Sequence, residues 1–116
     1  MNRLRLLLVF AFMASCHSAF KMVSISKQEH EEGKELLAHS DCMTCHMKEM
    51  RLIGPSFMQV TKKYAPTDRN IEKLSKKIIS GGSGNWGPIS MTPHPDLTKE
   101  DAATIVKYIL SIKNFQ

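Results

Sequence analysis

The sequence predicts an all-α domain of three to five helices, and three observations carry this prediction. Apolar residues recur at helical spacing in several segments, and most of these segments begin at a residue that can cap a helix. No segment shows a convincing strand pattern. The stretch 81–97 is rich in glycine and proline and is predicted as a long irregular loop.

The first and last helices are expected to cross closely. Ser26 can cap the first helix, and Thr98 followed by Asp101 approximates a capping box for the last. Gly33 lies inside the first helix, where glycine costs about 1 kcal/mol relative to alanine. A close crossing near Tyr108 of the last helix would explain that glycine.

Two further helices are expected between these two. Phe57, Val60 and Tyr64 form a weak helical pattern. Asn70 can cap the next helix, and Gly81 can end it. The domain is therefore predicted to consist of helices joined by one long loop.

The run Cys42-Met43-Thr44-Cys45-His46 has the residue types that attach a haem covalently. Two thiols three residues apart can add to the two vinyl groups of one porphyrin, and the adjacent imidazole then falls under the iron as its proximal ligand. An iron redox centre makes electron transfer the first functional hypothesis.

Other uses of these residues remain open. A thioredoxin-like redox pair also has the spacing of Cys42 and Cys45, although it belongs in an alternating strand–helix context that this sequence lacks. A structural zinc site needs four ligands, of which Cys42, Cys45 and His46 supply three. Chance occurrence in a short chain is the third alternative.

The predicted loop contains a candidate distal haem ligand. A loop of this length is usually functional or disordered, and its Trp86 and Met91 argue against disorder. Met91 lies between prolines, as a distal thioether requires. Met58 lies in a helical pattern and is assigned to the core. Three further methionines lie too close to the proximal side: Met43, Met47 and Met50.

Taken together, the motifs resemble the small monohaem bacterial class I cytochromes c. The resemblance covers roughly residues 28–113 and rests on the attachment run, on Ile53-Gly54-Pro55-Ser56-Phe57, and on the glycine-rich stretch 81–88 followed by Met91. It implies a class I cytochrome c fold wrapped around one covalently bound haem c.

The resemblance also implies roles for individual residues. His46 and Met91 would be the axial ligands, Pro55 would accept a hydrogen bond from the ring of His46, and Trp86 would approach a haem propionate. His94 is either a structural loop residue or a rival axial ligand, and the structural role is favoured because Met91 fits the family position.

The N-terminal residues 1–16 are predicted to be a signal peptide. Arg3 and Arg5 form a basic region before the apolar stretch 6–14, which is too short to span a bilayer. The run 13–16 resembles a lipoprotein cleavage box, so cleavage before Cys16 and lipid on its thiol are predicted. The alternative is ordinary cleavage near Ala19, which would discard Cys16.

The mature chain would consist of a tether at 17–26 and a domain at 27–116. Its charge is modest, because removing Arg3 and Arg5 lowers the formal net charge from +5 to +3. That charge does not favour a nucleic-acid partner. Five lysines could form a basic docking face for an acidic partner, although such clusters are more often merely solvated: Lys62, Lys63, Lys73, Lys76 and Lys77.

The functional prediction is a one-electron carrier outside the cytoplasm, exchanging electrons with membrane-associated redox proteins. No catalytic set for hydrolysis and no phosphate-binding loop is recognisable, so no enzymatic activity is predicted. The alternatives are a haem enzyme, a gas-binding protein, or a dedicated cytochrome subunit of a larger oxidoreductase complex.

Overall fold

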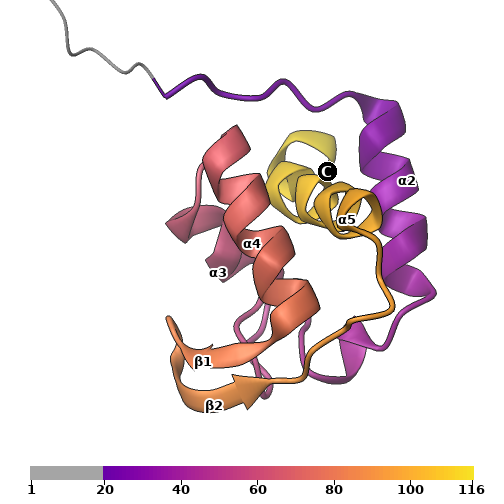
Figure 1. The fold of residues 1–116 in the computed structure, drawn as a ribbon. Helices are drawn as coiled ribbons and strands as arrows, with labels where there is room; N and C mark the ends of the chain where they lie inside the picture. The colour runs from indigo at the N-terminus through magenta and orange to yellow at the C-terminus, as the bar shows by residue number, and fades with distance from the viewer. Residues whose placement is uncertain (1–19) are drawn as a thin grey trace, which may run out of the picture.

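The computed structural model describes residues 20–116. The predicted signal peptide, with Cys16, lies outside the described residues. The elements are, in order, α2 (Lys27–Ala38), the 3-10 turn η1 (Cys42–Thr44), α3 (Phe57–Lys63), α4 (Asp68–Ser80), β1 (Gly82–Gly84), β2 (Gly87–Met91), α5 (Lys99–Ser111) and the 3-10 helix η2 (Ile112–Phe115). Figure 1 shows α2, α4 and α5 packed around one core, with β1 and β2 below α4. The all-α prediction is confirmed.

The predicted crossing of α2 and α5 at Gly33 is confirmed. A Cβ on Gly33 would collide with the backbone carbonyl oxygen of Thr104 and lie only 2.6 Å from the Cβ of Tyr108. The two helices lie side by side in Figure 1. Glycine is required here because the backbones approach more closely than any side chain allows.

Polar contacts add to the same helix pair. Lys107 of α5 donates to the Glu29 carboxylate of α2 at 2.7 Å, and this bond is the main cause that lowers the pKa of Glu29 to about 2. The buried His30 lies 2.7 Å from the Ser111 hydroxyl through Nδ1, and burial lowers its pKa. The pairing of α2 with α5 is thus specified by packing and by two long-range polar contacts.

The helix starts follow local capping chemistry. Ser26 forms a full capping box with Glu29, and the Thr98 side chain accepts from the Asp101 amide. The prediction that Asn70 caps α4 is wrong, because Thr67 is the cap and accepts from the Asn70 amide. The Asn70 side chain instead donates to the Ala65 carbonyl. Gly81 ends α4 as predicted, with a φ of 65°.

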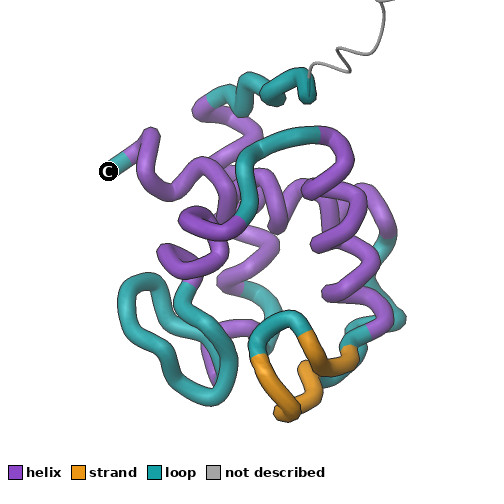
Figure 2. Tube along the Cα trace, turned by 90° about the vertical axis from the view of Figure 1, so that its left-hand side faces the viewer, coloured by secondary structure: helices purple, strands orange, loops and turns teal. Residues whose placement is uncertain are grey.

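The stretch predicted as irregular contains a short antiparallel hairpin, which corrects the expectation of no strands. β1 pairs with β2 through Gly82 with Met91 and Gly84 with Gly87. Three of these four residues are glycines with φ between 99° and 118°. The strands therefore form through backbone pairing, and the sequence lacks the alternation of apolar side chains by which strands are recognised. The hairpin is orange in Figure 2.

The predicted tether meets the domain before its end. The Val23 amide donates to the Pro66 carbonyl at 2.7 Å, Met22 forms an isolated bridge with Thr67, and Ile25 packs against the core. From Met22 onward the chain is therefore attached to the domain. Among the described residues, no helix is long and apolar enough to cross a membrane.

Candidate functional site

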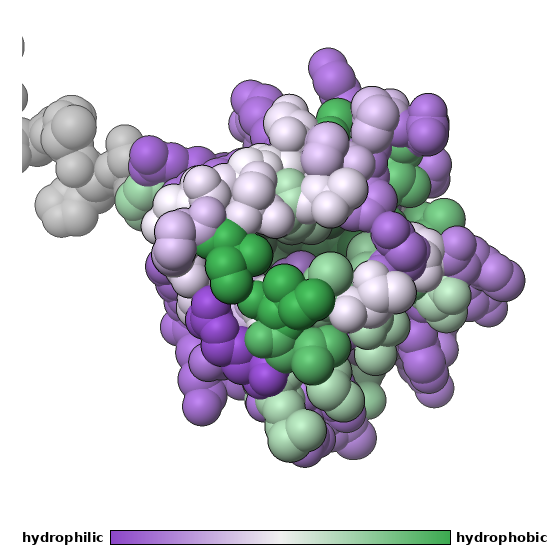
Figure 3. Space-filling view, turned by 90° about the horizontal axis from the view of Figure 1, so that it is seen from below, coloured by the Kyte–Doolittle hydropathy of each residue, from purple (hydrophilic) through white to green (hydrophobic). Residues whose placement is uncertain are grey.

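A cleft of about 1340 Å³, including space open to solvent, collects all six residues that the sequence singles out as cofactor-binding. Figure 3 shows this hollow from below, with hydrophobic residues gathered beside it. The cleft extends to the core at α5, where Ile105 and Val106 are fully buried. The six predicted residues that line it are Cys42, Cys45, His46, Pro55, Trp86 and Met91.

The turn η1 places the two thiols on one side of the cleft. Cys45 and His46 both donate their amides to the carbonyl of Cys42, at 3.2 and 3.0 Å. Both cysteines are free thiols, Cys42 buried and Cys45 half-buried. No group of three or more His, Cys, Asp and Glu side chains among residues 20–116 is placed to hold a metal ion, so the zinc alternative finds no ligand set there.

The His46 ring is fixed in orientation and in tautomer. Its Nδ1 lies 2.7 Å from the Pro55 carbonyl oxygen, as the sequence predicts. A carbonyl only accepts, so Nδ1 carries the proton, and Nε2 retains the lone pair that a metal ligand needs. Phe57 stacks on the ring with centroids 5.7 Å apart, and these two contacts together hold the imidazole in place.

Gly54 completes this clamp, and sequence reasoning assigned it no role. A Cβ on Gly54 would collide with Cε1 of His46 and lie 2.8 Å from Nδ1 and 3.0 Å from Nε2. The Gly54 amide donates to the Cys45 carbonyl at 2.8 Å, which holds this backbone against the attachment turn. The ring therefore contacts both an aromatic face and a glycine that leaves no room for a side chain.

We expect Gly54→Ala to displace the His46 ring and to weaken its bond to Pro55. Overpacking of this kind destabilises by about 1–3 kcal/mol. Chemical denaturation of the haem-loaded protein measures the loss of stability, and its optical spectrum reports iron ligation. Gly84→Ala is the control for an added methyl group, because no atom lies within 4 Å of the Cβ there, although its positive φ carries a strain of its own. A Gly54→Ala protein as stable as the parent would mean that the ring has room to move.

Two basic side chains hold the hairpin turn beside the cleft. Arg51 donates to the Trp86 carbonyl at 3.0 Å, and Lys63 donates to the Asn85 carbonyl at 2.7 Å. The Lys63 ammonium also lies 4.3 Å from the centroid of the Trp86 ring. Lys63, predicted as part of a docking face, thus serves to position Trp86.

The end of α4 positions Met91. A Cβ on Gly81 would collide with the Met91 carbonyl oxygen and lie 2.8 Å from the Pro93 nitrogen, so the hairpin closes tightly against the helix end. The His94 amide donates to the carbonyls of Ile78 and Ile79 at 3.1 and 3.2 Å. Backbone contacts on both sides therefore hold the segment that bears the Met91 thioether.

Both ring nitrogens of His94 are occupied by contacts within the protein. Its Nε2 lies 2.7 Å from a carboxylate oxygen of Asp41, and its Nδ1 lies 3.3 Å from the Ile78 carbonyl. The hydrogen bond from His94 holds the pKa of Asp41 below its usual range. Because Asp41 precedes Cys42, this contact joins the Met91 segment to the attachment turn. The geometry supports the structural role of His94.

The donor set fits a haem c. One cleft presents two free thiols on a single turn, an imidazole with Nε2 unprotonated, a thioether on the hairpin, and an apolar wall. Sequence reasoning assigned no positioning role to Asp41, Arg51, Gly54 and Phe57, although Gly54 and Phe57 belong to the motif on which the family resemblance rests. Arg51 and Asp41 contact residues 35 and 53 positions away, so no local pattern could have revealed their roles, whereas Gly54 and Phe57 contact His46 within the same short segment.

Comparison with known sequences places the chain among small electron-transfer proteins. The sequence profile described as Cytochrome c matches residues 30–113. Cytochrome c-551 of Azotobacter vinelandii is 42% identical over 83 residues, which are 72% of this chain and all of that protein. Cytochrome c-552 of Hydrogenobacter thermophilus is 38% identical over 81 residues, 70% of this chain and 82% of that protein.

Solved structures agree. The crystal structure of wild-type Nitrosomonas europaea cytochrome c552 is similar with a TM-score of 0.63 and 33% identity, covering 67% of this chain and 96% of that chain. The Class 1 cytochrome MtoD of Sideroxydans lithotrophicus ES-1 shares the fold, with a TM-score of 0.58 and 23% identity.

Proposed function

Because this chain belongs to the cytochrome c family, we propose that Cys42 and Cys45 hold its haem c by thioether bonds and that His46 and Met91 ligate the iron. The observation that carries the proposal is the hydrogen bond between His46 Nδ1 and the Pro55 carbonyl. It assigns the proton to Nδ1 and so leaves Nε2 of the neutral imidazole free to bind iron, in a cleft that the thiols and the thioether also line.

The protein binds one covalent haem c and is a one-electron carrier, with no enzymatic activity. When bound, the haem supplies an iron that cycles between the ferrous and ferric states. For this function the protein has to hold the haem, shield it from water and leave part of it accessible to redox partners. Different residues of the site contribute to each of these tasks.

Each residue of the site acts by holding a position. Pro55, Gly54 and Phe57 fix the His46 ring, so that the ligand nitrogen does not rotate. Lys63 and Arg51 hold the turn that bears Trp86, from which the indole N–H can approach a propionate. The apolar wall excludes water, and with thioether ligation this raises the reduction potential.

Acid–acetone extraction tests the attachment. Protein expressed with cytochrome c maturation machinery should keep its haem through extraction, because thioether bonds survive where coordination does not. The Cys42→Ala, Cys45→Ala variant should release all of it. Cys16→Ala is the control for loss of a thiol and should retain the haem. Free extraction from the parent chain would refute covalent attachment through these cysteines.

The protein works outside the cytoplasm, and we propose that lipid on Cys16 anchors it to a membrane there. Support comes from the basic residues and apolar stretch at the N-terminus and from the small residues before Cys16. Several acyl chains give stable attachment, whereas one chain is marginal. The carrier would then meet redox partners that are themselves membrane-associated.

Intact-mass analysis of the native protein tests the anchor. We expect a chain that begins at Cys16 and carries acyl groups. Cys16→Ser should block this processing and leave an unlipidated precursor. A native product that begins near Phe20 and carries no lipid would overturn the anchor and leave the haem chemistry unaffected.

A further inference from the structure

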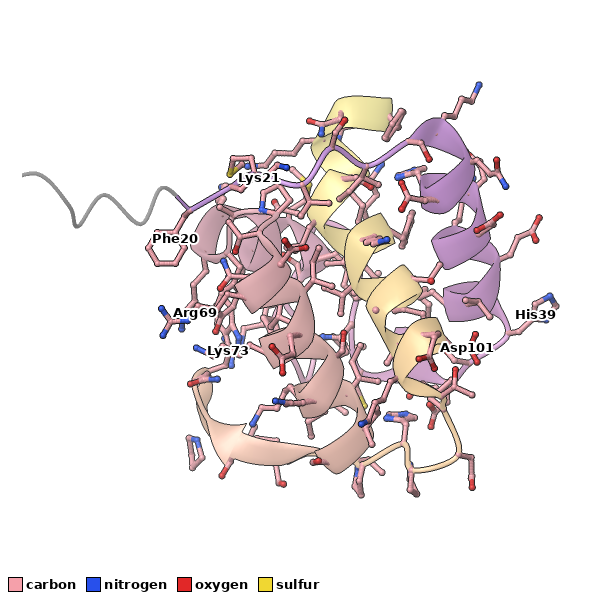
Figure 4. The ribbon with its side chains drawn as sticks, turned by 45° about the horizontal axis from the view of Figure 1, so that its top comes forward. Phe20, Lys21, His39, Arg69, Lys73 and Asp101 are labelled. Carbon is pink, nitrogen blue, oxygen red and sulfur yellow. The ribbon has the colours of Figure 1, made fainter. Side chains whose placement is uncertain are left out.

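Basic and apolar side chains gather where the described chain begins. Phe20 is 64% exposed and Met22 is 57% exposed, and the Arg69 guanidinium lies 5.9 Å from the centroid of the Phe20 ring. Lys73 follows Arg69 by one helical turn on α4. Figure 4 shows Phe20, Arg69 and Lys73 on one side of the molecule, with Lys21 next to Phe20. We call Phe20, Lys21, Met22, Arg69 and Lys73 the basic face.

The other side of the molecule has the opposite charge balance. Helix α2 carries four glutamates and two lysines, whereas α4 carries one arginine and three lysines with two acidic residues. Figure 4 places His39 and Asp101, near α2 and the start of α5, across the molecule from Arg69 and Lys73. A negatively charged surface would therefore orient the protein with α4 toward it and α2 away.

We propose that the basic face contacts the anionic lipid surface of the membrane that carries the protein, an inference that rests on the proposed anchor at Cys16. Five residues lie between Cys16 and Met22, where the chain joins the domain, so six Cα–Cα steps connect the two. Six such steps span at most about 20 Å even when fully extended. Because the screening length at physiological salt is about 8 Å, even an extended tether keeps Lys21 within roughly two screening lengths of the lipid-bearing residue.

The exposed apolar residues of this face match the same partner. Phe20 and Met22 flank Lys21, so apolar side chains that can enter the interfacial region alternate with a cation that attracts lipid headgroups. Each lysine or arginine near an anionic surface strengthens binding by about fivefold, the equivalent of about 1 kcal/mol. Lys21, Arg69 and Lys73 are all exposed and belong to this face.

The basic face lies apart from the cleft, and this separates it from the surface that an acidic redox protein would use. Arg69 and Lys73 do not line the cleft, whereas Arg51 and Lys77 do. A protein that exchanges electrons must approach the cleft and would meet the latter pair. The described chain begins at the upper left of Figure 1, and the hairpin that borders the cleft lies at the bottom. Contact through the basic face therefore leaves the cleft open to partners.

Lysine labelling tests the contact on the full-length holoprotein. The protein is placed in vesicles of phosphatidylcholine, alone or mixed with phosphatidylglycerol, and treated with acetic anhydride before peptide mass analysis. We expect Lys21 and Lys73 to react several-fold more slowly on the anionic vesicles. Lys34 on α2 should react equally on both, and high salt should remove the difference.

Matched variants distinguish the effect of the basic face from the effect of the protein's net charge. Arg69→Gln with Lys73→Gln should abolish the protection of Lys21, whereas Lys27→Gln with Lys34→Gln, which removes the same charge from α2, should preserve it. Equal labelling of Lys21 on both vesicle types would overturn the proposal. Protection of Lys73 that appears only when an acidic redox protein is added would overturn it in favour of protein docking.

The intact mass of the same preparation shows whether the anchor itself has failed. If the chain carries no acyl groups, the anchor is wrong, and flotation with phosphatidylglycerol vesicles then decides on the basic face alone. Weaker flotation of the Arg69→Gln, Lys73→Gln protein than of the Lys27→Gln, Lys34→Gln control would support the lipid contact. Equal flotation of the two variants would refute it.

Discussion

Replacement of Met91 by alanine is expected to open the iron to carbon monoxide and to lower the reduction potential by on the order of a hundred millivolts. Thioether ligation raises the potential of a His-ligated haem, and axial ligands together span about 0.8 V. The hairpin should survive, because its contact with the end of α4 uses the backbone at Gly81. Optical spectra with and without carbon monoxide, and a redox titration, measure both effects.

The control is Met58→Ala, which removes a thioether that packs against the core from α3. We expect that variant to lose stability and to keep the spectrum of the parent. An unchanged spectrum in Met91→Ala would instead move the ligand assignment to another residue. His94 would be the first to examine, and it would have to leave Asp41 to reach the iron.

Gly33→Leu is expected to lower the melting temperature while iron ligation stays intact. The first added carbon already collides with the Thr104 carbonyl oxygen, which is backbone and cannot rotate away. Separation of α2 from α5 should cost at least about 1–3 kcal/mol. For a domain of this size, each kcal/mol lowers Tm by about 4–8 °C. Thermal unfolding followed by circular dichroism gives the shift.

Ala38→Leu is the control, because Ala38 is exposed on the same helix. It adds three carbons and should change Tm little. The spectrum of Gly33→Leu should match that of the parent, since the crossing lies outside the cleft residues. A Gly33→Leu protein as stable as the parent would show that the helices can separate without loss.

Local signals predicted those parts of the fold that depend on neighbouring residues. Ser26 and Thr98 were recognisable as caps because a capping side chain bonds an amide three residues ahead. Gly33 was recognisable because glycine inside a helix needs a packing reason, and the sequence offered Tyr108 as its partner. The attachment run carries its chemistry within five residues. For the caps and the attachment run the interacting residues are neighbours in the chain, and for Gly33 the local signal is the glycine inside a helix, although its packing partner lies on the last helix.

Other features depend on contacts that no local pattern reveals. Thr and Asn are both residue types that commonly cap helices. Only the fold determines that Thr67 caps α4 and that the Asn70 side chain donates to the Ala65 carbonyl. The hairpin is built on glycines, so it lacks the alternation by which strands are recognised. The pairing of Asp41 with His94 spans 53 residues. These choices are made by tertiary packing.

The cleft is lined by residues that elsewhere belong to the protein's interior. Five apolar residues of α4 and α5 border it: Leu74, Ile78, Ile105, Val106 and Ile109. A chain that has been exported but not yet fitted with its prosthetic group presents this apolar wall to water, so α4 and α5, which border the cleft, lack a packing partner there. Unfinished molecules should therefore open more often and be cut by resident proteases. Proteolysis would in this way remove molecules that lack haem, so that mainly haem-loaded carriers accumulate.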